Sequence, residues 1–303
     1  MNLPNSFFAS LSMALTIVAA GAGTTSPSEP LAGGRLFGLW QTNGVLFKEA
    51  QPYRGVGANY FDLFLRVPHE PANRTSIDGL ERLGRAGIPF VRFAVAFDDT
   101  DWKVLLDQPE EFFRRLDSVV RAAERANVGL IPSFFWSFMS FPDLTSEPRD
   151  QWGNPDSKKS WKADSKEQTL EILRRDNPAP LDTIAIHLYA DQPVRKETAA
   201  WAKDHAEYLL AVRQLSREMK RPVFVGEFGL ASPGATGDTK AEFERLLADL
   251  DQGQVDLAAF WVFDLASQSQ DWSVTFENAR AYMIKLTAEA NRRWNRAAMH
   301  EQP

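Results

Sequence analysis

The chain alternates short apolar segments with longer amphipathic ones. Residues 223–225 are continuously apolar, which is typical of a parallel strand buried on both faces, whereas residues 107–126 repeat apolar side chains at helical spacing. The pattern predicts six strands, at residues 53–61, 89–96, 128–134, 182–189, 222–228 and 256–263. It predicts a hairpin at 36–48 that covers the bottom of the sheet, a helix with Asp164 as its N-cap, and helices at 77–85, 107–126, 197–220, 239–250 and 276–297.

Strands that alternate with amphipathic helices imply a parallel sheet, either a (β/α)8 barrel or a doubly wound sheet. Polar or aromatic residues end nearly every predicted strand: Asn59, Arg92, Trp136, His187, Tyr189, Glu227 and Trp261. In a barrel the C-terminal ends of all strands converge on one mouth, whereas a doubly wound sheet gathers ligands at a single switch point. We therefore expect an α/β fold of the TIM-barrel type.

The N-terminus is typical of a secretory signal peptide. Residues 7–22 are apolar or small, end in Ala20-Gly21-Ala22, and precede a polar segment that contains prolines. We expect a signal peptide at 1–22, a linker at 23–35, the barrel domain at 36–297 and a tail at 298–303, and hence a secreted, extracellular or periplasmic protein. No Lys or Arg precedes Arg35, so an uncleaved membrane anchor is the alternative.

Composition narrows the function. The net charge of -6, with no Lys/Arg-rich run to offset it, argues against nucleic acid as a partner. The lack of cysteine excludes disulfides, Cys-ligated zinc and thiol catalysis. No Walker A motif and no strand-linked G-x-G-x-x-G motif occurs, which argues against a bound nucleotide. We expect no cofactor and no metal. Nine Trp and 21 Phe suit a carbohydrate ligand, because the C–H faces of sugar rings stack on aromatic side chains.

Residues 221–229, Arg-Pro-Val-Phe-Val-Gly-Glu-Phe-Gly, form an apolar strand that closes on one carboxylate. Glu227 is the first residue of this strand that can meet solvent or ligand, which makes it the leading catalytic candidate. An acidic residue at a strand end can also cap a helix or pair with an arginine, and this segment alone does not separate these roles.

Five strand-end segments occur in order at the spacing of barrel units: 53–59 (Tyr-Arg-Gly-Val-Gly-Ala-Asn), 90–93 (Phe-Val-Arg-Phe), 186–189 (Ile-His-Leu-Tyr), 225–229 (Val-Gly-Glu-Phe-Gly) and 260–263 (Phe-Trp-Val-Phe). From about residue 36 to 290 the chain thereby resembles glycoside hydrolase family 5, the secreted cellulase and mannanase group of retaining (β/α)8 enzymes. The resemblance implies hydrolysis of β-1,4-linked mannan or glucan. We expect a monomer whose partner is a β-linked polysaccharide or oligosaccharide.

The resemblance also implies roles for the strand-end residues. Retaining hydrolysis uses one carboxylate as nucleophile and a second carboxyl, about 5–5.5 Å away, as acid and base. Glu227 matches the nucleophile, and Arg92 matches the arginine that keeps this carboxylate ionised and oriented. The other matches are His187 and Tyr189, which hydrogen-bond the nucleophile and the sugar, and Trp261, which forms the platform under the reacting sugar. Asn59 and Trp136 are further candidates for substrate binding or support of the site.

Some of these residues have a structural alternative. A single histidine or tryptophan on a strand is more often part of the core, and an arginine beside a carboxylate is often a buried structural ion pair. The spacing of His187 and Tyr189 favours the functional role, because residues two apart on a strand point to the same face.

The sequence departs from the family at the acid/base. The family carries that glutamate in an Asn-Glu pair at the end of strand four, and this chain contains no Asn-Glu pair. Predicted strands start 36, 39, 54, 40 and 34 residues apart, and the interval of 54 is too short for the three βα units expected there. A block near residues 157–161 that carries strands four and five is therefore missing.

The alternative is a replacement acid on the long loop of residues 137–163, although a loop positions a proton donor poorly. The candidates are Asp143, Glu147, Asp150 and Asp156. Loss of two adjacent strands exposes two hydrogen-bonding edges, so we expect an incomplete barrel of about six strands, with modest stability and impaired hydrolysis. The competing hypotheses are a non-catalytic carbohydrate-binding remnant and a deletion product that seldom folds.

Overall fold

The structure is a computed structural model, and it describes residues 38–48, 51–70, 72–97, 99–134, 165–189, 201–231 and 237–300. The expected signal peptide and linker lie outside these residues. So do Trp136 and the four candidate acids of the long loop, Asp143, Glu147, Asp150 and Asp156.

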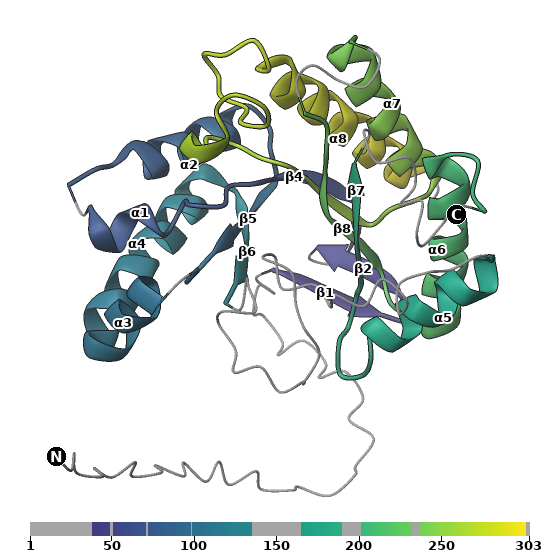
Figure 1. Cartoon of the computed structure of the whole chain (residues 1–303), viewed down its shortest axis with the longest axis horizontal. Coiled ribbons are helices and arrows are strands. Elements are labelled where there is room, and N and C mark those ends of the chain that lie inside the picture. The colour runs from purple at the N-terminus through teal and green to yellow at the C-terminus, as the bar shows by residue number, and fades with distance from the viewer. Residues whose placement is uncertain are drawn as a thin grey trace, which may run out of the picture. The chain divides into compact units, whose positions relative to one another are not determined.

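A six-stranded parallel sheet forms the centre of the fold (Figure 1). Its strands are β4 (Gly55–Asn59), β5 (Phe90–Ala94), β6 (Gly129–Ser133), β7 (Ile184–Tyr189), β8 (Val223–Gly229) and β9 (Leu257–Phe260). The order in the sheet is β6-β5-β4-β9-β8-β7. The strands that come first and last along the chain, β4 and β9, therefore pair with each other, as they do in a barrel. Within the described residues β6 and β7 are edge strands, and the barrel is not closed. This confirms the prediction of an incomplete barrel with six strands.

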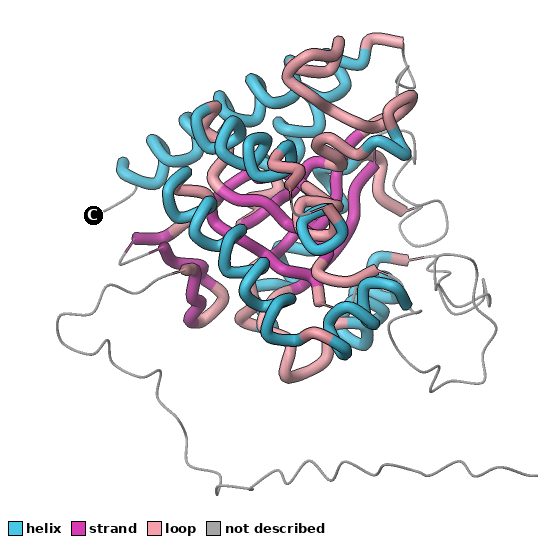
Figure 2. Tube along the Cα trace, turned by 90° about the vertical axis from the view of Figure 1, so that its left-hand side faces the viewer, coloured by secondary structure: helices cyan, strands magenta, loops and turns pink. Residues whose placement is uncertain are grey.

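Helices cover the outer face of the sheet (Figures 1 and 2). They are α1 (Arg66–His69), α2 (Thr75–Arg85), α3 (Asp99–Asp107), α4 (Pro109–Ala126), α5 (Lys166–Asp176), α6 (His205–Met219), α7 (Thr239–Gln252) and α8 (Tyr282–His300). No helix within the described ranges has the length and apolar character needed to cross a membrane.

Several predicted helix boundaries are wrong for local reasons. The helix predicted at 107–126 is α4 and begins at Pro109, because Pro109 disfavours a helical conformation in the residue before it and itself suits a first helical position. Asp107 is instead the last residue of α3. Asp164 is not the N-cap of α5: the Ser165 side chain accepts the bond from the Gln168 amide. Asp204 caps α6 in the same way, so α6 begins at 205 and not at 197.

The N-terminal hairpin is confirmed. Strands β1 (Leu39–Thr42) and β2 (Val45–Lys48) pair antiparallel, and β3 (Gln51–Pro52) adds a short third strand. Leu46 is buried in a small cluster with Phe90, Leu257 and Ala259, which are side chains of the sheet. The hairpin therefore covers the interior of the sheet at the end opposite the C-terminal strand ends.

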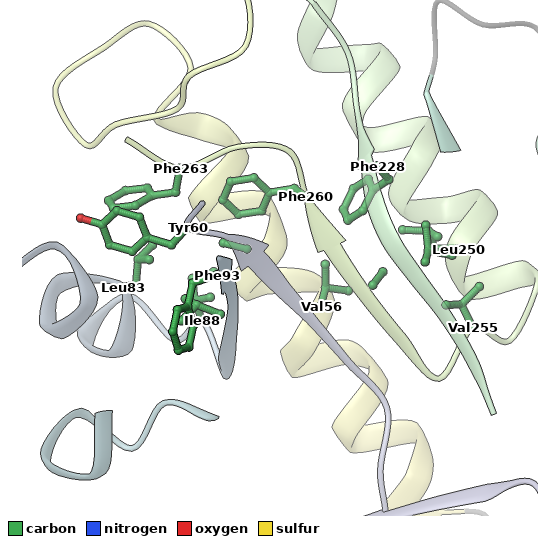
Figure 3. Close-up of a cluster of buried hydrophobic side chains, with 14 of the residues drawn as sticks. Val56, Tyr60, Leu83, Ile88, Phe93, Phe228, Leu250, Val255, Phe260 and Phe263 are labelled. Atoms are coloured by element: carbon green, nitrogen blue, oxygen red, sulfur yellow. The ribbon is translucent and has the colours of Figure 1, made fainter. Parts of the chain in front are cut away.

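Successive side chains of each strand alternate between the interior of the sheet and the helices. Figure 3 shows part of the helix-facing set, including Phe228 of β8. Phe228 stacks on Phe243 of α7 with ring centroids 5.7 Å apart. The interior side is crowded as well: a Cβ at Gly57 would lie 2.4 Å from the Phe90 carbonyl oxygen. Both faces are thus packed, which explains the continuous apolar runs in the sequence.

The edge strand β6 contains a proline. Gly129 and Ser133 hydrogen-bond to the β5 side, since the Gly129 amide donates to a carbonyl before β5 and Ser133 accepts from Val95 just after it. In a parallel strand the bonding direction alternates, so Leu130 and Pro132 direct their backbone groups to the outer edge. Pro132 has no N–H to offer there, and proline in a sheet is confined to such edges.

Helix α8 is bonded directly to the central strand β4. Paired residues of β4 and β5 begin at Ala58, so Val56 lies outside that ladder. The buried side chain of Asn291 replaces the missing strand: its Oδ1 accepts from the Val56 amide at 2.7 Å and its Nδ2 donates to the Val56 carbonyl at 2.8 Å. One side-chain amide thus satisfies two buried backbone groups.

We predict that Asn291→Ala lowers the free energy of unfolding by about 2–5 kcal/mol, because it leaves both Val56 groups buried and unpaired. Urea denaturation monitored by circular dichroism measures the loss. The matched control is Arg293→Ala, a change at an exposed position of the same helix, which should alter stability by less than about 0.5 kcal/mol. Equal effects of the two substitutions would contradict the assigned role of Asn291.

Candidate active site

Glu227 lies at the end of β8 and is 8% exposed. A β-bulge decides where its side chain points. On β7, Ile186 and His187 are consecutive, but their partners on β8 are Val225 and Glu227, so Gly226 is an extra residue. The pairing of β8 with β9 also shifts between Val225 and Phe228.

The bulge reverses the alternation of β8. Phe224 faces the interior cluster and Val225 faces the helices. If Gly226 were paired as an ordinary strand residue, Glu227 would point to the helices like Val225. Because Gly226 is bulged, Glu227 points to the interior and Phe228 packs against α7. Gly226 is therefore what turns the carboxylate toward the other strand ends.

Arg92 of β5 is the cation beside this carboxylate. Its Nη1 lies 3.2 Å from Glu227 Oε1 and also donates to Asn59 Oδ1 at 3.1 Å, while its Nε donates to Ser133 Oγ at 3.1 Å. Burial lowers the pKa of Arg92 below its usual value, and the nearby negative charge of Glu227 opposes that shift. The ion pair is thus largely buried, and the guanidinium has an acceptor on three different strands.

Asn59 joins these strands from the centre. It is 1% exposed, and its Nδ2 donates to the carbonyls of Gly226 at 3.0 Å, Ala259 at 3.0 Å and Phe260 at 3.3 Å. Its Oδ1 accepts from Arg92. The same side chain therefore holds the bulge of β8, the end of β9 and the guanidinium.

Two residues of β7 approach Glu227 from the opposite side. Tyr189 donates its hydroxyl to Oε2 at 2.5 Å, and His187 Nδ1 lies 3.4 Å from the same oxygen. The predicted spacing of these residues on one face is confirmed. Glu227 thus has a cation on one oxygen, and a phenol and an imidazole on the other.

Trp261 follows β9 and lies at the same end of the sheet. Its indole is half-buried, packs edge-on against Phe61 with ring centroids 6.0 Å apart, and donates Nε1–H to Gln268 Oε1 at 2.7 Å. The structure therefore gathers six of the seven predicted site residues, since only Trp136 lies outside the described residues.

Three residues of the site were not predicted: Ser133, Gln268 and Trp272. Trp272 packs edge-on against Tyr189, with ring centroids 5.2 Å apart. Alternation along the predicted strand 128–134 could have indicated Ser133, because it is two residues beyond the interior-facing Ile131. No sequence period indicates Gln268 or Trp272, which lie in an irregular segment.

Asp62 and Asp264 lie beyond the C-terminal ends of β4 and β9, and both contact Arg66. Asp62 Oδ1 is 3.3 Å and Asp264 Oδ2 is 3.0 Å from Arg66 Nη2, and Asp264 also accepts from the Tyr60 hydroxyl. Burial raises the pKa of Asp62 to about 6, although Arg66 opposes this shift. Both carboxylates thus belong to a cluster around Arg66. No group of three His, Asp or Glu that could hold a metal occurs among the described residues.

No protein-family model and no curated protein sequence matches this chain. Solved structures do match. A family 5 mannosidase from Rhizomucor miehei is 11% identical, with a TM-score of 0.54 over 84% of this chain and 97% of that chain. An endo-1,4-β-mannanase from the same organism is 13% identical, with a TM-score of 0.53 over 84% of this chain and 99% of that chain.

This chain has the fold of the family 5 glycoside hydrolases. A third match supports this: the exo-β-1,4-mannosidase Op5Man5 from Opitutaceae bacterium strain TAV5 is 15% identical, with a TM-score of 0.52 over 84% of this chain and 62% of that chain. The fold predicted from the strand-end segments is confirmed, and the described residues contain six strands of such a barrel.

We predict that Asn59→Ala lowers the free energy of unfolding by about 2–4 kcal/mol, because it removes a buried donor from several carbonyls and an acceptor from Arg92. The comparison variant is Ser133→Ala, which removes only one acceptor from Arg92 and should cost about 1.5 kcal/mol. The shift of the urea unfolding midpoint, at an unchanged m-value, measures the loss of unfolding free energy in each variant. A smaller effect at Asn59 than at Ser133 would show that Asn59 is not the central connection.

Proposed function

We propose that this protein is a secreted glycoside hydrolase of family 5 that cleaves β-1,4-linked mannan or glucan with retention, with Glu227 as its nucleophile. The observation that carries the proposal is the environment of Glu227. A buried carboxylate held by an arginine, a tyrosine and a histidine at the convergent ends of parallel strands is suited to attack an anomeric carbon.

Each contact has a part in this chemistry. The charge of Arg92 favours the ionised, nucleophilic form of Glu227. The hydrogen bond from the Tyr189 hydroxyl fixes one oxygen of Glu227 and thereby orients the carboxylate. Trp261 offers an aromatic face at the same end of the sheet, on which a sugar ring can stack. The three similar structures named above, each with a TM-score above 0.5, are two mannosidases and a mannanase, so mannan is the first polymer to test.

The second candidate function is a carbohydrate-binding protein that no longer turns over polymer. It is favoured by the edge of the sheet at β6, next to which the family's acid/base strand would lie. A glycosidic oxygen of a polymer is a poor leaving group without a proton donor. In this alternative Trp261 still binds a sugar chain while Glu227 reacts only with activated substrates.

We predict that an aryl β-mannoside with a dinitrophenolate leaving group gives a burst of about one equivalent of phenolate, because this leaving group needs no acid. Glu227→Gln should abolish the burst, with a rate lower by about 10³-fold or more. Stopped-flow absorbance measures the burst. The matched control is Glu244→Gln on the exposed face of α7, which should leave the burst unchanged.

Release of reducing sugar from mannan separates the two functions. Turnover of mannan or glucan that depends on Glu227 supports the hydrolase, and it would require an acid from elsewhere in the chain. A Glu227-dependent burst without turnover of either polymer supports the binding protein. A folded protein with no burst and no binding of mannohexaose or cellohexaose would overturn both.

We also propose that residues 1–22 are removed as a signal peptide, leaving an extracellular or periplasmic monomer. The apolar segment at 7–22 and its small-residue end support this proposal. Mass spectrometry of the protein recovered from the medium or periplasm of an expression host tests it, and an intact N-terminus would contradict it.

A further inference from the structure

The segment that follows β9 has a well-defined conformation. We call residues 264–275 the β9 loop. Its two ends are joined, because the Asp264 amide donates to the Val274 carbonyl at 3.0 Å and the Val274 amide donates to the Val262 carbonyl at 2.8 Å. Ser273 is held further through its carbonyl, which accepts from Asn278 Nδ2 at 2.8 Å and Arg280 Nη1 at 3.0 Å. The loop is thus fixed at its base.

Gln268 lies inside this loop and contacts the sugar platform. Its carbonyl accepts from the amides of Trp272 at 3.0 Å and Ser273 at 2.9 Å, which fixes its backbone. Its side-chain Oε1 accepts from the Trp261 indole at 2.7 Å. An indole can rotate about two side-chain bonds, and a directional bond at Nε1 selects one orientation of the ring plane.

Trp272 contacts the donor to the nucleophile. Its ring packs edge-on against the Tyr189 ring, with an interplanar angle of 79°. Tyr189 is the last residue of β7, which is an edge strand within the described part of the sheet. Trp272 therefore supports a side chain that lacks a neighbouring strand on one side, and that side chain donates to Glu227.

We propose that the β9 loop positions the reacting groups: Gln268 sets the plane of Trp261, and Trp272 holds the Tyr189 hydroxyl against Glu227. Both are positioning residues, since they act through residues that touch the sugar or the nucleophile. The kinetic consequence rests on the proposed function, whereas the two positioning contacts do not.

The test of Gln268 is Gln268→Leu, which keeps the volume and removes the acceptor. We expect mannohexaose to bind about fivefold more weakly, as for the loss of one hydrogen bond. In a ¹H–¹⁵N spectrum the indole resonance of Trp261, assigned with Trp261→Phe, should move upfield. The matched control is Gln270→Leu, an exposed position of the same loop, which should change neither binding nor the resonance.

The test of Trp272 is a double-mutant cycle in which Trp272 and Tyr189 are substituted singly and together. We expect Trp272→Ala to slow the burst by about tenfold with unchanged mannohexaose binding, and Trp272→Phe to restore most of the rate because it keeps an aromatic edge contact. In a Tyr189→Phe background, Trp272→Ala should have almost no further effect, since the hydroxyl it positions is absent. A purely structural role would give additive losses.

The outcomes separate this inference from the proposed function. If the wild-type burst depends on Glu227 but Gln268→Leu and Trp272→Ala behave like the wild type, the inference is wrong and the function stands. If the wild type shows neither binding nor burst, the function is wrong, and the Trp261 resonance in Gln268→Leu still decides the first contact. An unmoved resonance overturns it. Should Trp272→Ala fail to fold, Trp272→Phe and Trp272→Leu supply the comparison.

Discussion

Burial of the Glu227 carboxylate is the constraint on which the rest of the site depends. A carboxylate removed from water is costly unless a cation and hydrogen-bond donors compensate for the lost hydration. Arg92 supplies the cation, but a buried guanidinium needs acceptors of its own, and it finds them on Asn59 and Ser133. Asn59 in turn binds the carbonyl of Gly226, next to the carboxylate. Each of these polar side chains therefore satisfies a group on another strand, and together they connect β4, β5, β6 and β8.

This arrangement explains how the site can exist in an incomplete barrel. The strands that hold Arg92 and Glu227 lie on the two sides of the central pair β4 and β9, where each has neighbours on both sides. The edge strands contribute Ser133 at one end and Tyr189 at the other. The ion pair thus depends on the intact part of the sheet, whereas the hydrogen bonds that orient it depend on the edges. A substitution on an edge strand would therefore change the orientation of Arg92 or Glu227 and leave the ion pair between them in place.

The sequence predicted the features that follow from side-chain pattern alone. Runs such as 223–225 must be buried on both faces, and the ends of such runs must share one rim, so Arg92 and Glu227 could be placed together. The side of β8 on which Glu227 lies was not predictable, because it depends on the extra residue Gly226, and a glycine in a strand has several possible causes. Contacts from irregular segments, such as that of Trp272, depend on tertiary hydrogen bonds that leave no periodic signal.

Pro132 affects self-association of the protein at high concentration. Within the described residues β6 and β7 are the two edges of the sheet, and a contact between these unlike edges of two molecules would be head to tail, which leads to open chains of molecules instead of a closed dimer. Within β6 only Leu130 can donate an N–H across that edge, since Pro132 occupies the other outward position. The proline therefore weakens the very pairing that would let an opened barrel polymerise.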